Sequence, residues 1–226
     1  PCTVSDSTEV QPLFSGNPAR LASSVLEQAG LQQQIRRRGK AFVFSGPSGV
    51  GEDAVLDYFL PRFPDCERLV TVTTRPKRDD EIDGVHYIFV SPERFEALEA
   101  EGQFLETADV YGFKYGSPKW KVRELTGAGT DVILKLDVQG GLTVKKRMPE
   151  AVMIFLAAPS LEELERRLRG RDTETPESLR RRLGKAEWEM SQIPEYHYIV
   201  INDVIERAAR DLGAIITAER AKLGEE

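Results

Sequence analysis

From Lys40 onward, short runs of apolar residues alternate with longer stretches in which apolar residues recur every three or four positions. The short runs are typical of buried strands, and the longer stretches are typical of helices with one apolar face. The predicted strands are 41–45, 68–74, 85–90, 132–138, 152–157 and 198–201. The predicted helices are 53–60, 92–101, 118–127, 140–147, 160–169, 177–191 and 203–222. Strands separated by helices indicate an α/β fold with a mostly parallel sheet flanked by helices.

Two of the predicted helices carry clear start signals. Ser91 stands before Pro92, which suits a serine cap followed by a proline in the first turn. Ser160 is followed three residues later by Glu163, which is the spacing of a capping box. Trp120 and Trp188 fall within predicted helices, and we expect both to lie in the core.

Two segments depart from the regular alternation. Residues 1–38 are polar and rich in Ser and Gln, and they predict a partly disordered leader or an appended helix over about 18–35. Residues 39–224 predict one domain, with a core formed by 39–70 and 130–222. Between these, the stretch 68–117 is denser in strands and aromatic residues, and it predicts an inserted lobe that binds substrate.

The segment between the first predicted strand and the first predicted helix is rich in glycine. It fits the G-x-x-x-x-G part of a phosphate-binding loop (P-loop), and a strand before it and a helix after it are the context that this motif requires. In such a loop, backbone N–H groups converge on a phosphate and the helix adds the positive end of its dipole. A purely structural turn is the alternative. The loop consists of Gly46, Pro47, Ser48, Gly49, Val50 and Gly51.

The two positions after the loop depart from the motif. Glu52 stands where a lysine normally neutralises the β- and γ-phosphates, and Asp53 stands where a Ser or Thr normally ligates Mg²⁺. Two unit charges about 4 Å apart at an effective dielectric near 20 interact by about 4 kcal/mol, so Glu52 predicts slower phosphoryl transfer. Asp53 is predicted to be the metal ligand, since a carboxylate can bind Mg²⁺. We expect Lys135 to lie near the loop and to pair with Glu52.

A second group of residues follows further along the chain. Arg75 and Arg78 lie three apart on a turn and can hold a phosphate from two sides, although a basic turn is usually only surface. The order and spacing of several polar and glycine-containing segments after this pair are specific when taken together. These segments are 83–87, 102–106, 111–117, 137–140 and 170–175.

With these pieces in this order, residues 40–222 resemble the guanylate kinase family, which transfers a phosphoryl group from ATP to GMP. The resemblance implies a P-loop nucleoside monophosphate kinase fold with a GMP-binding lobe at about 71–120 and a helical lid at about 160–185. It also implies that ATP and Mg²⁺ bind at 46–53, with Asn202 near the adenine. The residues implied to bind GMP are Thr71, Arg75, Arg78, Tyr87, Glu106, Tyr115, Ser117 and Asp137. The residues implied in catalysis are Arg75, Asp137 and the lid arginines Arg167, Arg171 and Arg182.

The chemistry of guanine agrees with these assignments. Guanine presents two adjacent donors, N1–H and the 2-amino group, and a single carboxylate such as Glu106 can accept both. The hydroxyls of Thr71 and Ser117 can donate to O6. A site built from buried polar groups rejects adenine, because those groups would then be left unpaired. Phosphoryl transfer needs in-line positioning and positive charge, which mobile arginines supply.

Composition limits the remaining possibilities. The chain has 226 residues, with 31 basic and 37 acidic ones, and its net charge of −6 disfavours non-specific nucleic-acid binding. Two cysteines are too few for a disulfide framework and favour a reducing compartment. No apolar stretch approaches the length of a membrane span. We expect a cytoplasmic monomer or homodimer. Because the first residue is Pro1, an organellar presequence remnant in residues 1–38 is the alternative.

Three functions remain open at this level. The first is a guanylate kinase that uses Mg·ATP and GMP, and the second is a GMP-binding pseudokinase slowed by Glu52. The third is a guanylate-kinase-like interaction module, which the complete set of GMP-binding residues disfavours. Glu52 is either compensated by a neighbouring cation or is a substitution, engineered or erroneous, in an otherwise ordinary enzyme.

Overall fold

The computed structural model describes residues 38–169 and 176–222, with side chains in the second range from residue 181 onward. The chain divides into residues 1–37 and residues 38–226. The helix predicted over 18–35 and the predicted lid residue Arg171 both lie outside the described residues.

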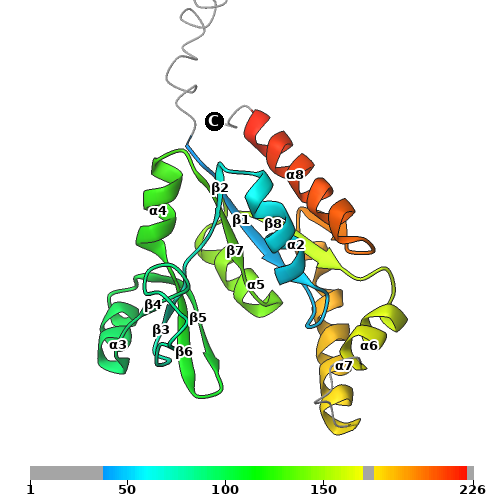
Figure 1. The fold of residues 1–226 in the computed structure, drawn as a ribbon, viewed down its shortest axis with the longest axis horizontal. Helices are drawn as coiled ribbons and strands as arrows, with labels where there is room; N and C mark the ends of the chain where they lie inside the picture. The colour runs from blue at the N-terminus through cyan, green and yellow to red at the C-terminus, as the bar shows by residue number, and fades with distance from the viewer. Residues whose placement is uncertain (1–37, 170–175, 223–226) are drawn as a thin grey trace, which may run out of the picture. The chain divides into compact units, whose positions relative to one another are not determined.

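The central sheet has five strands in the order β2-β7-β1-β8-β9, and every neighbouring pair in it is parallel (Figure 1). Its strands are β1 (Ala41–Ser45), β2 (Cys66–Arg68), β7 (Asp131–Lys135), β8 (Val152–Ala157) and β9 (Tyr198–Ile201). Strands covered on both faces read as unbroken apolar runs, and β1 and β8 are buried along their whole length. The predicted α/β class with a mostly parallel sheet is confirmed.

Alternate residues of β1 face different cores. Phe42 and Phe44 pack in the cluster that includes residues of α2 and α8, whereas Val43 packs in the cluster that includes residues of α4 and α5. The helices are α2 (Glu52–Phe59), α3 (Pro92–Ala100), α4 (Lys119–Gly127), α5 (Val138–Arg147), α6 (Leu161–Arg169), α7 (Pro176–Ser191) and α8 (Ile205–Ala221), with short 3₁₀ turns η1 (Leu60–Arg62) and η2 (Ile193–Glu195). The sheet is therefore a layer between two apolar cores, each closed by helices.

A second sheet of four strands lies within residues 72–118, in the order β4-β3-β6-β5 (Figure 1). It is formed by β3 (Val72–Thr73), β4 (Ile88–Phe89), β5 (Phe104–Val110) and β6 (Phe113–Pro118). Its own core contains Val72, Phe95, Leu98 and Phe104, with Trp120 packed against it. This sheet has a core separate from those of the central sheet.

Several predicted boundaries were wrong. The strand predicted over 68–74 is two strands in two sheets, because β2 pairs with β7 and β3 pairs with β6. The strand predicted over 132–138 ends at Lys135, and α5 begins at Val138 with Asp137 as its cap. The β5–β6 hairpin was not among the predicted strands. Trp188 was expected in the core, but its exposed fraction is 42%.

Candidate functional site

The P-loop follows the carboxyl end of β1 and leads into α2 (Figure 1). Gly49 and Gly51 have φ of 90° and 96°, in the left-handed region where a side chain is strained. A Cβ atom at Gly46 would lie 2.3 Å from the carbonyl oxygen of Leu156. A Cβ atom at Gly51 would lie 2.8 Å from Nδ2 of Asn202. The loop glycines are therefore required both by backbone conformation and by close packing.

Two side chains fasten the loop from outside. Nδ2 of Asn202 donates to the carbonyl oxygen of Val50 at 2.8 Å. Arg167 on α6 donates from Nη1 to the same oxygen at 3.2 Å and from Nη2 to the carbonyl oxygen of Asn202 at 2.8 Å. Its Nε donates to Glu163 at 2.7 Å. Arg167 thus holds the loop in this structure, and its predicted action on the phosphoryl group stays a prediction.

Glu52 lies in an enclosed position at the start of α2. Its Oε1 atom is buried and has no hydrogen-bond partner among the described residues. Burial raises the pKa of Glu52 from 4.5 to about 8, against the opposing charge of Lys135. Burial thus favours the protonated form of Glu52 near neutral pH. The repulsion expected at this position assumed a charged carboxylate, a form that burial disfavours here, and the expected slowing of phosphoryl transfer stays a prediction.

Lys135 was expected to pair with Glu52, but in the structure it pairs with Asp53. Nζ of Lys135 lies 2.7 Å from Oδ2 of Asp53, and Nη1 of Arg68 lies 3.0 Å from Oδ1. Asp53 is the more exposed of the two acids and can keep its charge, whereas Glu52 is enclosed. The pKa of Asp53 is lowered because the hydrogen bonds and charges of Lys135 and Arg68 outweigh the partial burial of Asp53. The group of Lys135, Arg68 and Asp53 carries one net positive charge beside the P-loop.

Buried polar atoms without partners gather around this loop. The described residues contain four such atoms: the carboxylates of Glu52 and Glu189 influence each other and the phenol of Tyr196 by charge, and the hydroxyl of Ser45 lies beside that phenol. Glu189 on α7 also accepts a hydrogen bond from the backbone of Ser48 in the loop. Unpaired buried polar atoms indicate a place where a ligand or water completes the bonding. The four atoms belong to Ser45, Glu52, Glu189 and Tyr196.

Three of the residues predicted to bind the GMP phosphate, Arg75, Tyr87 and Tyr115, come together beside the second sheet. The guanidinium carbon of Arg75 lies 5.4 Å from the ring centre of Tyr87, and the rings of Tyr87 and Tyr115 are 5.8 Å apart. Nη2 of Arg75 donates to Glu81 at 2.5 Å. The bond from Arg75, followed by one from the backbone of Arg78, lowers the pKa of Glu81 to about 2. Glu81 therefore keeps its charge and fixes the turn that carries both arginines.

Two of the residues predicted to bind guanine, Glu106 and Ser117, are also adjacent. Oγ of Ser117 lies 2.6 Å from Oε1 of Glu106, and both side chains are buried. Burial raises the pKa of Glu106, and the bond from Ser117 opposes the rise. Ser117 has one hydroxyl proton, so in this arrangement it orients Glu106 instead of donating to O6. Thr71, which precedes β3, is half-buried, and its role toward O6 stays a prediction.

One face of β6 connects the two ends of this site. Tyr115 and Ser117 are two residues apart on β6, so their side chains lie on the same face about 7 Å apart along the strand. Tyr115 hydrogen-bonds Arg75, and Ser117 bonds Glu106. The carboxylate of Glu106 and the guanidinium of Arg75 are thereby both bonded to side chains of β6, and their binding of a purine monophosphate stays a prediction.

Asp137 links the start of α5 to α7, which lies in the predicted lid. Its Oδ1 accepts from the backbone N–H of Gly140 at 2.8 Å and caps α5, and its Oδ2 lies 3.3 Å from Nζ of Lys185 on α7. Lys185 also lies 3.4 Å from Glu189. The predicted lid residue Arg182 is half-buried on the same helix. Asp137 thus contacts α7 from the start of α5.

A family model described as guanylate kinase matches residues 38–219. The chain belongs to the guanylate kinase family. It is 47% identical over 190 residues to a guanylate kinase of Thermus thermophilus, covering 83% of this chain and 84% of that protein. It is 45% identical over 184 residues to a guanylate kinase of Chromobacterium violaceum, covering 81% and 88%. The crystal structure of guanylate kinase from Anaplasma phagocytophilum is similar, with a TM-score of 0.61 and 32% identity, covering 82% of this chain and 88% of that one.

Asp53 does not fit the role of metal ligand in this member of the guanylate kinase family. Both of its carboxylate oxygens are bonded to cations, and a divalent ion there would lie beside the charges of Lys135 and Arg68. The described residues contain no group of three or more His, Cys, Asp or Glu side chains able to hold a metal ion. Within the same residues, no helix has both the length and the apolar character needed to cross a bilayer.

Sequence reasoning missed four residues of this guanylate kinase site. Arg68, Glu81, Lys185 and Glu189 each bond to a predicted site residue or to the P-loop. Glu81 lies six residues after Arg75 in one turn, a proximity that could have suggested an ion pair. Lys185 and Glu189 lie four apart on α7, which is the spacing of a helical ion pair. Their approach to the P-loop depends on tertiary packing and has no local signal.

Proposed function

We propose that this chain transfers a phosphoryl group from Mg·ATP to GMP, giving ADP and GDP. The observation that carries the proposal is the shared face of β6, on which Glu106 and Arg75 are held by Ser117 and Tyr115. The P-loop at the carboxyl end of β1 supports the donor side. We further propose that the chain acts on free nucleotides in the cytoplasm, as a monomer or homodimer, and not on nucleic acid.

Glu106 selects guanine in this proposal. Its ionised carboxylate accepts from N1–H and from the 2-amino group, while Ser117 keeps the carboxylate oriented through the bond at 2.6 Å. Adenine presents an acceptor at N1, so the buried carboxylate would face an unpaired acceptor. The phosphate of GMP is held by Arg75 and Arg78, with the phenols of Tyr87 and Tyr115 as further donors.

The phosphates of ATP are neutralised by cations that differ from the usual P-loop lysine. Glu52 contributes no repulsion while it is protonated, and Lys135 with Arg68 brings net positive charge to the start of α2. Lys185 lies on the lid side, bonded to Asp137 and Glu189. Mg²⁺ supplies charge at the terminal phosphates and enters with ATP as part of the substrate. Arg171, Arg182 and Arg167 are the proposed lid arginines, and Asn202 is proposed to lie near the adenine.

The test is a coupled assay of ADP formation from ATP and GMP, with AMP and CMP as control acceptors and dGMP as a further acceptor. Wild-type chain, Glu52→Lys and Lys135→Met are compared, with Lys121→Met as a control that removes a lysine paired with Glu124 on α4. We expect wild-type activity with GMP, a loss of at least about tenfold in Lys135→Met, and none in Lys121→Met. Equal activity of both lysine variants would contradict the role of Lys135.

The same assay separates the alternatives. Glu52 and the engaged Asp53 favour the pseudokinase as the second candidate, and that function predicts GMP binding with activity only in Glu52→Lys. An interaction module predicts no binding of GMP by either protein. Calorimetric titration with GMP distinguishes these two results when no turnover is seen.

A further inference from the structure

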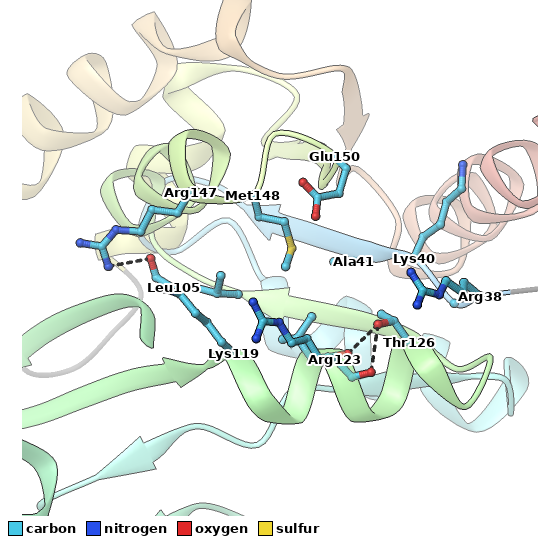
Figure 2. Close-up of a pocket in the computed structure, with 12 residues that line it drawn as sticks. Arg38, Lys40, Ala41, Leu105, Lys119, Arg123, Thr126, Arg147, Met148 and Glu150 are labelled. Carbon is cyan, nitrogen blue, oxygen red and sulfur yellow. Dashed lines mark hydrogen bonds between the residues drawn. The ribbon is translucent and has the colours of Figure 1, made fainter. Parts of the chain in front are cut away.

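A cavity of about 560 Å³ lies at the amino end of β1, the opposite end of that strand from the P-loop (Figure 2). We propose that this cavity, here called the rear pocket, binds a small phosphate ester with an apolar body, and that its occupancy weakens guanine binding. Ligand binding in the rear pocket is independent of the proposed function. The effect of that binding on GMP affinity rests on the proposed function. Cavities of about 300–1,000 Å³ are the usual size for small-molecule sites.

The lining of the rear pocket combines an apolar floor with an excess of cations. Ala41, Leu105, Val122 and Met148 supply the apolar surface. Five basic side chains and one acidic side chain line it, in a chain whose net charge is −6. A flat apolar group can rest on the floor while a phosphate meets the cations. The charged residues are Arg38, Lys40, Lys119, Arg123, Arg147 and Glu150.

Some of these cations are already bonded, which identifies the donors that remain. Nζ of Lys40 lies 3.2 Å from Glu219, and Nζ of Lys119 donates to the carbonyl oxygen of Gly102 at 2.8 Å. The guanidinium of Arg123 has no hydrogen-bond or ion-pair partner among the described residues, and Figure 2 shows it directed toward the cavity from α4. A guanidinium fork matches two oxygens of a phosphate. Arg123 is therefore the principal anchor of the proposed ligand.

The rear pocket and the predicted guanine site use adjacent residues of β5. Leu105 lines the pocket, and the next residue on β5 is Glu106, in the stretch where the register of β5 shifts against β6. Lys119 lines the pocket two residues after Ser117. Nη1 of Arg147 donates to the carbonyl oxygens of Phe104 and Leu105 at 3.2 Å each. A ligand in the rear pocket thus contacts β5 and the start of α4, the segments next to Glu106 and Ser117.

The hydrogen bonds from Arg147 to the carbonyl oxygens of Phe104 and Leu105, next to Glu106 on β5, set the direction of the coupling. Burial raises the pKa of Glu106, and the charge of Arg147 is among the effects that oppose the rise. An anion in the pocket that draws Arg147 away from these carbonyl oxygens loosens β5 beside Glu106 and weakens that opposition, so ionised Glu106 becomes less favourable. Guanine needs the ionised carboxylate, because both of its donors require an acceptor. The phosphate ester is therefore expected to lower the affinity for GMP.

The binding test uses phenyl phosphate as the probe and ¹³C-methyl methionine as the reporter. The chain has three methionines, of which Met148 lines the rear pocket and Met153 is fully buried in the core. With ADP and GMP present to fill the nucleotide sites, we expect a saturable shift of the Met148 signal and none at Met153. Inorganic phosphate is the second probe and should bind more weakly, because it cannot use the apolar floor.

Arg123→Gln should lower the affinity for phenyl phosphate at least about tenfold, because one charge-assisted hydrogen bond is lost. Lys121→Gln is the matched control, since it removes one positive charge from the same helix outside the pocket lining. Equal weakening by both variants, or no Met148 shift, would overturn the site. Inorganic phosphate that binds as tightly as phenyl phosphate would overturn the proposed ligand class.

The coupling is measured by titrating GMP with and without saturating phenyl phosphate. We expect GMP affinity to fall about fivefold or more, and phenyl phosphate affinity to fall by the same factor when GMP is bound. An unchanged GMP affinity would overturn the coupling. GMP binding without the probe is measured in the same series, so failure of the proposed function is seen separately from failure of the rear pocket.

Discussion

At the scale of single residues, the P-loop of this chain shows how burial changes the meaning of a charge. A glutamate in the lysine position reads as a repulsion when it is treated as ionised. Enclosure under the loop raises the pKa of Glu52 to about 8, and the nearby ammonium of Lys135 bonds the more exposed Asp53. Burial thus favours a neutral side chain at this position near pH 7, and the positive charge beside the loop comes from Lys135 on β7 and Arg68 on β2.

The raised pKa of Glu52 predicts a pH-dependent stability. Between the ordinary value of 4.5 and about 8, the folded chain keeps a proton that the unfolded chain has released. The stabilisation is fully present below pH 4.5 and is lost as pH rises through about 8, at most about 1.4 kcal/mol per pH unit. Glu52→Gln cannot titrate, so urea unfolding at about pH 5.5 and about pH 7.5 should show it gaining up to about 3 kcal/mol on wild type. Parallel pH curves for both proteins would contradict the burial argument.

Glu106→Gln predicts a loss confined to the GMP side. The amide nitrogen of glutamine would face the two donors of guanine, and a charge-assisted acceptor would be lost. We expect kcat/KM for GMP to fall by about 100-fold, corresponding to about 3 kcal/mol, with KM for ATP unchanged. Steady-state kinetics with each substrate varied measure this. Glu124→Gln on α4 is the control, and an equal loss in that variant would remove the role of Glu106.

At the scale of elements, packing between glycines and their neighbours fixes the P-loop. Gly51→Ala would strain a φ of 96° and push a methyl group toward the amide of Asn202, which holds Val50. We expect a loss of about 1–3 kcal/mol in the free energy of unfolding, together with weaker ATP binding. Gly184→Ala in α7 meets no atom within 4 Å and should gain up to about 1 kcal/mol. Urea titrations of the two variants should therefore shift in opposite directions.

The sequence predicted the elements of the central sheet better than those of the second sheet. Runs such as 41–45 and 152–157 are buried on both faces, so their apolar composition reveals them directly. The β5–β6 hairpin is half-exposed and contains Gly116, which lies against the ring of Phe104, where a Cβ atom would be 2.7 Å from a ring carbon. That requirement is visible only after the strands pair. The pairing of Lys135 with Asp53 is likewise visible only in the folded structure, because it depends on which of the two acids is buried.

At the scale of the whole molecule, the proposed reaction requires water to be excluded from the transferring phosphate. The proposed donor loop follows β1 in the central sheet, and most of the residues proposed to bind GMP lie on or beside the second sheet, so in this proposal both must approach during turnover. We expect small-angle scattering of the chain with GMP and a non-hydrolysable ATP analogue to give a smaller radius of gyration than that of the free chain. Each ligand alone is the control. Identical profiles in all states would contradict closure.

Arg167 has a consequence for how this protein fails under stress. The guanidinium of Arg167 joins α6 to the carbonyl groups of Val50 and Asn202, so the same side chain holds the helix, the P-loop and the segment after β9 together. Local opening that frees α6 must also release the backbone that cradles the donor phosphates. Protease nicking within α6 and the decay of nucleotide binding should then follow a single time course during gentle heating, well before the central sheet melts.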